Sequence, residues 1–199
     1  NLIGRYYDIQ KGAIYIDDVD IRLLSKKQLR SAIGQMQQDV FIFEGTVESN
    51  IRLYNEEITE KEVREAAEYV NASHFIEKLP LAYKEPVSER GSTFSAGERQ
   101  LLSFARTLAH KPSILVMDEA TANIDTDTES LIQEALEKLM KGRTTIMVAH
   151  RLSTIQHADC IMVMHKGKIR EQGTHQELLA QDGIYRKLYE LQINHEVTA

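Results

Sequence analysis

The chain has 199 residues, of which 42% are hydrophobic and 27% charged, a composition typical of folded proteins that excludes an intrinsically disordered chain. Thirty acidic and 24 basic residues give a formal net charge of -6, whereas proteins that bind a nucleic-acid backbone normally carry a basic surplus. The longest apolar runs have about five residues, so we expect neither a membrane-spanning helix nor a secretory leader in this sequence. The single cysteine, Cys160, has no partner for an internal disulfide, and its apolar neighbours predict a core position.

The first part of the chain has short segments with strand character. Residues 13–16 and 33–43 carry apolar runs that predict strands. Between them, Ser25 and Gln28 have the spacing of a capping box, in which two side chains satisfy the first backbone N–H groups of a helix. We therefore expect a short helix between two strands.

The middle of the chain has a helical pattern. Thr59 and Glu62 form a second predicted capping box, and the apolar residues that follow, among them Val63 and Val70, recur at helical spacing. We expect residues 53–108 to form a helical insert within a larger α/β body.

The next part predicts a parallel sheet. Residues 114–117 form a short continuous apolar run, as in a strand buried on both faces. Thr126 and Glu129 predict the cap of an amphipathic helix, and residues 144–149 form the next strand. Because a strand, a helix and a strand in this order need a crossover connection, the two strands are predicted to be parallel.

The last 40 residues predict a hairpin and a helix. Residues 160–164 and 169–172 flank Lys166 and Gly167, a turn sequence, and the methionines of the first strand are expected in the core. Thr174 and Glu177 predict the cap of a C-terminal amphipathic helix. The predicted fold class is α/β.

Polar residues follow two of the predicted strands directly. Asp118 and Glu119 come after the strand at 114–117, and His150 comes after the strand at 144–149. Ligands of open parallel sheets bind at the carboxyl ends of the strands. Neighbouring residues on an extended backbone point to opposite sides, so one carboxylate is expected to hold a hard cation and the other to accept a proton from water. The alternative is that all three merely end their strands.

The pentapeptide Phe94-Ser95-Ala96-Gly97-Glu98 precedes a predicted helix. Ser95 and Glu98 have capping-box spacing, which by itself explains their presence. A functional interpretation is that small residues leave the N–H groups of the helix N-terminus open to an anion such as a phosphate.

Four separate strings occur in the order and spacing of a known family. Gln38-Asp39, SERGSTFSAGERQLLSFAR (88–106), ILVMDEATANID (114–125) and VAHRLST (148–154) together resemble the ATP-binding-cassette (ABC) ATPases. The strings RYYD and FEGTVESNI are similar to those of the exporter branch. The resemblance covers nearly the whole chain and implies the fold of the P-loop NTPases, with a largely parallel sheet and an inserted helical subdomain.

This resemblance implies roles for four residues at the strand ends. Gln38 would be the Q-loop glutamine, which touches the metal and the transmembrane partner. Asp118 would position Mg2+, Glu119 would be the general base for water, and His150 would lie near the γ-phosphate of ATP. The cofactors implied are ATP and Mg2+.

It also implies residues that act across a dimer of such domains. Asp125 would belong to the D-loop at the dimer interface. Ser95 and Gly97, in the signature segment with Ala96 and Glu98, would contact the γ-phosphate of ATP held by the partner chain. The implied partners are therefore a second ABC ATPase domain and the coupling helices of a transmembrane domain.

The chain departs from the family pattern in three places. The phosphate loop G-x-x-G-x-G-K-[ST] (Walker A) is not in the sequence, and we expect the chain to start inside the helix that follows it. The usual signature LSGGQ is replaced by FSAGE at 94–98, and the D-loop has Ala122-Asn123-Ile124-Asp125. An altered signature beside Glu119 and His150 is similar to one subunit of the bacterial heterodimeric multidrug exporters.

The resemblance therefore implies an ATP-hydrolysing domain at the cytoplasmic face of the cell membrane, which drives export of a drug, lipid or peptide. Its α/β core would be about 1–52 and 109–199, and its signature subdomain about 53–108. This fragment alone is expected to be inactive, because most of its triphosphate site is missing. The alternatives are a soluble ATPase of the same superfamily and a regulatory nucleotide-binding partner without hydrolysis.

Overall fold

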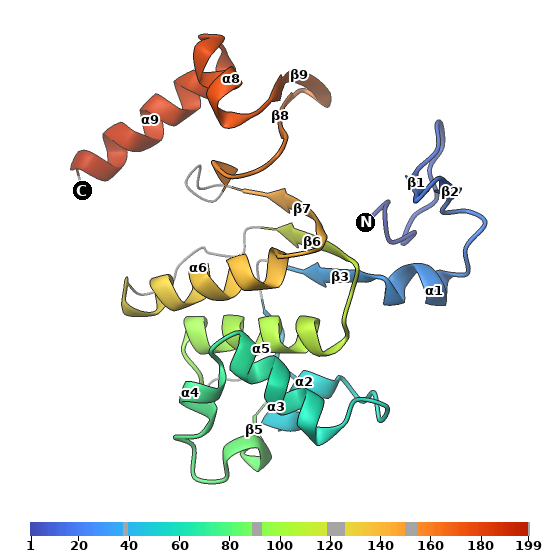
Figure 1. Ribbon diagram of the computed structural model, residues 1–199, viewed down its shortest axis with the longest axis vertical. Coiled ribbons are helices and arrows are strands. Elements are labelled where there is room, and N and C mark those ends of the chain that lie inside the picture. The colour runs from blue at the N-terminus through green and yellow to red at the C-terminus, as the bar shows by residue number, and fades with distance from the viewer. Residues whose placement is uncertain (38–39, 89–92, 119–125, 150–154, 199) are drawn as a thin grey trace. The chain divides into compact units, whose positions relative to one another are not determined.

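The computed structural model describes the chain as two compact units, residues 1–148 and 149–199, which are considered separately (Figure 1). The described residues are 1–37, 40–88, 93–118, 126–149 and 155–198.

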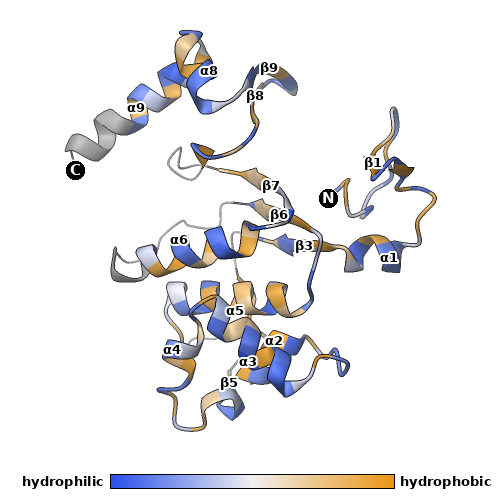
Figure 2. Ribbon diagram, viewed as in Figure 1, coloured by the Kyte–Doolittle hydropathy of each residue, from blue (hydrophilic) through white to orange (hydrophobic). Residues whose placement is uncertain are grey.

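The first unit contains a parallel sheet of strands β3 (Ile33–Met36), β6 (Ile114–Asp118) and β7 (Thr144–Val148), with β6 in the middle. Helix α6 (Thr126–Met140) is part of the connection from β6 to β7, as the strand–helix–strand pattern predicted. Leu115 and Met117 of β6 are fully buried, which anchors the central strand in the core. Figure 2 shows hydrophobic residues along β6 and β7.

A helical region lies beside this sheet. It contains α2 (Val47–Arg52), α3 (Glu60–Tyr69), α4 (Ser73–Ile76), the 3-10 helix η1 (Ala82–Lys84) and α5 (Ala96–Ala109), and the short strands β4 (Gly45–Thr46) and β5 (Pro86–Val87) pair antiparallel. Helix α5 packs against α2, α3 and α6, and its Phe104 is fully buried. The predicted boxes at Thr59 and Ser95 are confirmed. A further one joins Thr46 to Ser49, which has serine in the usual place of glutamate or glutamine.

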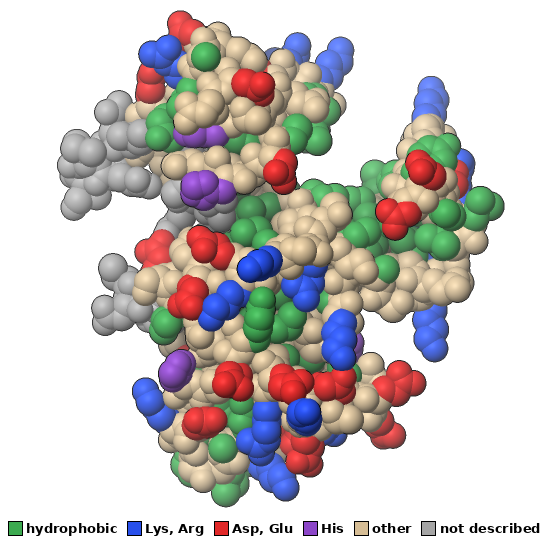
Figure 3. Space-filling view, in the orientation of Figure 1, with side chains coloured by type: hydrophobic (Ala, Val, Ile, Leu, Met, Phe, Trp, Pro, Cys, Tyr) green, Lys and Arg blue, Asp and Glu red, His purple; other side chains and the backbone are tan. Residues whose placement is uncertain are grey.

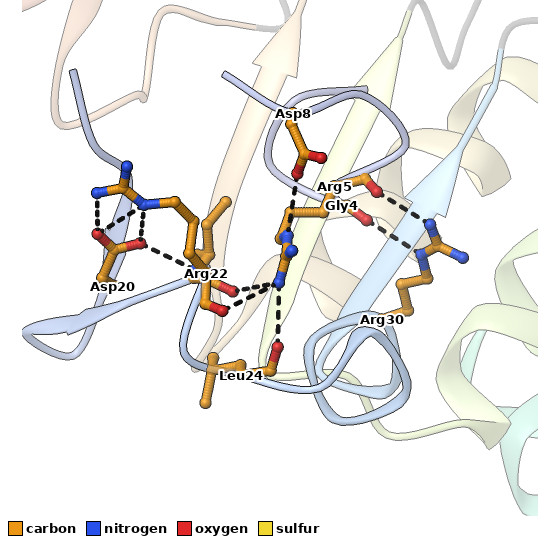
Figure 4. A network of polar contacts seen from close by, with 8 residues as sticks. Gly4, Arg5, Asp8, Asp20, Arg22, Leu24 and Arg30 are labelled. Atoms are coloured by element: carbon orange, nitrogen blue, oxygen red, sulfur yellow. Dashed lines mark hydrogen bonds and ion pairs between the residues drawn. The ribbon is translucent and has the colours of Figure 1, made fainter. Parts of the chain in front are cut away.

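The first 31 residues are held together mainly by two arginines (Figure 4). The guanidinium of Arg5 donates to the carbonyl oxygens of Ile21, Arg22 and Leu24 at 3.1–3.3 Å, and that of Arg30 donates to the carbonyl oxygens of Gly4 and Arg5. These contacts join the N-terminus to the hairpin of β1 (Tyr15–Ile16) and β2 (Val19–Asp20) and to helix α1 (Lys26–Ser31), whose predicted capping box at Ser25 is confirmed.

The second unit is a hairpin followed by two helices. Strands β8 (Ile161–His165) and β9 (Lys168–Gly173) pair antiparallel around Lys166 and Gly167, as predicted. The capping box at Thr174, confirmed, opens α8 (His175–Ala180), and α9 is Ile184–Thr198. The carboxylate of Glu171 accepts from the first two N–H groups of α9, those of Ile184 and Tyr185, at 2.5 and 2.9 Å. Glu171 therefore ties the hairpin to the start of α9.

Three expectations from the sequence are wrong in detail. Cys160 is exposed, and Met162 and Met164 are 57% and 66% exposed, because alternation along β8 turns Ile161 and Val163 inward instead. The strand predicted at 33–43 ends at Met36. Beyond it, the N–H and carbonyl groups of Phe43 bond the side chain of Asn50 and not a neighbouring strand.

Across the described part of the chain, no helix combines the length and hydrophobicity needed to cross a bilayer. On the face seen in Figure 3, acidic and basic side chains are interspersed over the helical region.

Candidate functional site

The carboxyl ends of the three parallel strands lie at one edge of the sheet. In the register, Met36 of β3 lies beside Met117 of β6, and Asp118 lies beside Val148 of β7. Asp118 is the last residue of β6, and its side chain is exposed. Asp118 thus places an exposed carboxylate at the end of β6, at the edge where parallel sheets bind ligands.

Four of the predicted site residues, Gln38, Glu119, Asp125 and His150, lie outside the described residues. Three of them follow the described strand ends closely in sequence: Gln38 comes two residues after β3, Glu119 one residue after β6 and His150 two residues after β7.

The second predicted group, Ser95 to Glu98, forms the N-terminus of α5. Ser95 is the N-cap, and its hydroxyl accepts from the N–H of Glu98 at 3.2 Å. The carboxylate of Glu98 in turn accepts from the N–H of Ser95 at 2.8 Å. Ala96 is exposed and Gly97 is buried. The capping box therefore engages two N–H groups and leaves those of Ala96 and Gly97 out of its bonds.

This helix N-terminus has features that favour an anion and one that opposes it. The N–H groups of the first turn and the helix dipole attract negative charge. Glu98 already places a carboxylate in that same turn, which counters the attraction. Figure 1 shows α5 running back alongside the sheet, so that its first turn and the carboxyl ends of the strands lie toward the same side of the first unit.

The donor set fits the cofactors that the sequence analysis named. Asp118 offers oxygen atoms, the ligands that Mg2+ prefers, on an exposed side chain. Ser95 contributes a hydroxyl, which can donate a hydrogen bond to an anion, next to the N–H groups of Ala96 and Gly97.

Three polar residues of this unit were not singled out from the sequence. Arg99 donates to the carbonyl oxygen of Phe94 at 2.5 Å and so fixes the segment before the helix. Asn50 is 2% exposed, and it forms hydrogen bonds with Arg106, which is partly buried. In the sequence, the signal that could have singled them out is a polar residue in a helix whose apolar residues recur at helical spacing.

Burial changes the pKa of two side chains near the C-terminal end of α5, those of Arg106 and His110. It lowers the pKa of the Arg106 guanidinium to about 10, which leaves the side chain charged at neutral pH. Burial also lowers the pKa of His110, whose Nε2 lies 3.1 Å from the carbonyl oxygen of Arg52. The electrostatic consequence is a charged, desolvated arginine beside a histidine that favours its neutral form.

Comparison with known proteins gives consistent matches. A family model described as ABC transporter matches residues 1–122. Over 192 residues, 96% of this chain, the sequence is 55% identical to the ABC transporter ATP-binding protein exp8 of Streptococcus pneumoniae serotype 4, covering 33% of that protein. It is 52% identical, again over 96% of the chain, to the multidrug resistance ABC transporter ATP-binding/permease protein YheH of Bacillus subtilis, covering 28% of it.

A solved structure of a bacterial Atm1-family ABC exporter with ATP bound is similar at a TM-score of 0.88 and 40% sequence identity, over 96% of this chain and 34% of that one. The chain thus spans about a third of the length of the relatives it matches. The shared fold is the α/β fold of the ABC ATPases. On the family model, these identities and the structural match, the chain belongs to the ABC transporter family, as an ATP-binding domain.

Proposed function

We propose that this chain binds and hydrolyses ATP as the nucleotide-binding domain of a membrane exporter. The observation that carries the proposal is its similarity, over 96% of its length, to an ABC exporter that was solved with ATP bound. The position of Asp118 at the carboxyl edge of a parallel sheet supports it independently. The exported substrate would be a drug, a lipid or a peptide.

In this proposal, the residues at the strand ends carry the chemistry. Asp118 and Gln38 hold Mg2+, which when bound supplies positive charge to the phosphate oxygens. Glu119 accepts the proton of the attacking water, and His150 donates a hydrogen bond near the terminal phosphate. Asp118 and Glu119 are adjacent in sequence, and adjacent side chains of an extended backbone point to opposite sides, so we propose that the two carboxylates serve these two separate tasks.

The signature turn would act on ATP held by a second ABC ATPase domain. Ser95 donates its hydroxyl, and Ala96 and Gly97 offer their N–H groups to the phosphate, while Asp125 contributes to the contact between the two domains. Such dimers work with transmembrane domains, and we propose that this domain contacts their coupling helices at the cytoplasmic face of the membrane. Residues 1–52 and 109–199 would form the core, with 53–108 as the signature subdomain.

We further propose that the two domains of the dimer differ. The supporting observation is Glu98, whose carboxylate sits in the first turn of α5, hydrogen-bonded to the N–H of Ser95. A carboxylate beside phosphate-facing N–H groups weakens anion binding. The site that uses this signature would therefore bind ATP weakly, while Glu119 would serve the other, active site.

The first experiment is Glu119→Gln in the full-length transporter. Loss of the general base is expected to lower ATP turnover about 10²–10⁴-fold, measured as phosphate release. The matched control is Glu137→Gln, the same change at an exposed position of α6, which is expected to keep full turnover. An unchanged rate in Glu119→Gln would refute its role as the base. Absence of ATP hydrolysis in the unmodified protein would favour the regulatory alternative.

The second experiment is Glu98→Gln in the same protein. Removing the carboxylate from the first helical turn is expected to tighten ATP binding at that site about two- to fivefold. The control is Glu60→Gln, which removes an acidic side chain from the first turn of α3. Binding of a fluorescent ATP analogue measures both, and equal affinities in all three proteins would contradict the proposed asymmetry.

A further inference from the structure

The segment between β3 and α2 is shaped by the side chain of one asparagine. Asn50 of α2 accepts from the N–H of Phe43 and donates to the carbonyl oxygens of Phe43 and Thr46, at 2.8, 2.8 and 3.0 Å. Ile42 is fully buried, whereas Phe41 and Phe43 are 49% and 38% exposed. The result is an irregular segment that presents two aromatic rings, 4.8 Å apart and edge to face, at the surface.

Helix α5 reaches this segment through Arg106. Its guanidinium donates to the carbonyl oxygens of Asn50 and Phe41 at 2.8 and 2.9 Å, and to the side-chain oxygen of Asn50 at 3.1 Å. The same group lies 5.6 Å from the ring of Phe43. Arg106 therefore connects α5 to Asn50 and to the backbone of Phe41, in the segment that Asn50 holds.

The charge balance around Arg106 is unusual for a partly buried cation. In the part of the chain that the structure describes, its contacts are carbonyl oxygens and a ring, and no carboxylate pairs with it. A cation removed from water without a counter-ion is costly, so the hydrogen bonds that Arg106 donates must offset its desolvation. What an apolar side chain lacks is the planar fork of donors that reaches several oxygens at once.

We propose that Arg106, together with Asn50, is a positioning residue that fixes the exposed Phe41–Phe43 segment to helix α5, so that ATP at the first turn of α5 changes the state of that segment. The inference rests on the proposed function. Arg106 lies 11 residues after Ser95, about 16 Å along one packed helix. Two relatives are about three times as long as this chain, and one of them is named as an ATP-binding/permease protein, so the test uses the full-length transporter.

The test is amide hydrogen exchange of the full-length transporter with and without Mg-ATP. In the unmodified protein, ATP is expected to change the exchange rates of residues 41–46 by about threefold or more. In Arg106→Met, which keeps the length of the side chain and removes its donors, that change is expected to vanish, while the ATP response of residues 96–98 persists. Arg106→Lys retains a charge but not the fork, and is expected to recover only part of the response.

One control variant and one comparison with helix α3 separate a positioning role of Arg106 from a general loosening of the structure. Arg170→Met, at an exposed arginine of β9, is expected to leave the response of residues 41–46 intact. Faster exchange in α3 as well as in residues 41–46 of Arg106→Met, with the ATP response preserved, would show a purely structural role and overturn the inference. A full ATP response at 41–46 in Arg106→Met, or none in the unmodified protein, would also overturn it. If labelled ATP does not bind at all, the proposed function itself fails.

Discussion

The helical region from Thr46 to Ala109 and the strands β7, β8 and β9 differ in where their large hydrophobic side chains lie. In the helical region, Val47, Ile51 and Phe104 are fully buried. In the strands, five large side chains are between 43% and 66% exposed: Ile146, Val148, Met162, Met164 and Ile169. Both regions are therefore apolar in sequence, but the helical region, which also packs against α6 through α5, buries more of its large apolar side chains than the strands do.

The difference follows from how the two kinds of element bury surface. A capped amphipathic helix has one apolar stripe, which helices close in sequence can cover. A strand has two faces; a parallel sheet is normally covered on both, whereas an antiparallel pair can leave one face to water. The helical region is covered by its own helices and by α6, whereas β7 and the β8–β9 hairpin each carry exposed apolar side chains in the described units.

The largest expected effect that tests this comparison is Phe104→Ala. The ring is fully buried where α5 packs against its neighbours, so its loss is expected to lower the free energy of unfolding by about 3–5 kcal/mol. The control is Ile146→Ala on β7, where a 43% exposed side chain is expected to cost less than about 1 kcal/mol. Denaturant unfolding measures both, and similar losses would remove the distinction between the two regions.

Local signals in the sequence were sufficient for four of the helix starts. The boxes at Ser25, Thr59, Ser95 and Thr174 each involve two residues three apart, and all four are confirmed. The box at Thr46 escaped notice because its partner is a serine. The parallel pairing of β6 with β7 was also predictable, since one helix connects them.

Non-local features were not predictable in the same way. The pairing of β3 with β6 joins residues 81 positions apart, such as Ile33 and Ile114, and no local pattern specifies it. Of the site, the position of Asp118 at a strand end followed from the hydrophobic run before it. The roles of Asn50 and Arg106 did not, because most of their partners are backbone groups, which carry no signature in the sequence.

A smaller effect is expected where the helical region meets strand β3. Gly34 of β3 lies against the end of α5, and a Cβ atom there would come within 2.8 Å of side-chain atoms of Pro112 and Thr107. Gly34→Ala is therefore expected to lower the free energy of unfolding by about 1–3 kcal/mol through overpacking. Thr107→Ser in the same chain removes the Thr107 methyl group, one of the two closest contacts, and is expected to restore part of the loss. A variant as stable as the unmodified protein would show that sheet and helix can shift apart at this contact.

The smallest expected effect concerns a single ion pair between helix α3 and Lys111, two residues after α5. The carboxylate of Glu62, at the start of α3, accepts from the ammonium of Lys111 at 2.6 Å and from the Thr59 cap, and these bonds lower its pKa from 4.5 to about 2. Because the folded pKa is below the unfolded one, the ionised carboxylate stabilises the fold above about pH 4.5. That contribution is lost as the pH falls from 4.5 towards 2.

Lys111→Met tests this ion pair by carbon NMR titration of the Glu62 carboxyl group. The variant is expected to raise the pKa of Glu62 part of the way to 4.5, because the bonds from Thr59 remain. Lys141→Met, at an exposed lysine after α6, is the matched control and is expected to leave that pKa unchanged. An unshifted pKa in Lys111→Met would mean that the cap alone sets it. The ionised Glu62 carboxylate would then be stabilised by near neighbours in sequence alone. Its contact with Lys111, 49 positions away, would contribute nothing to its pKa.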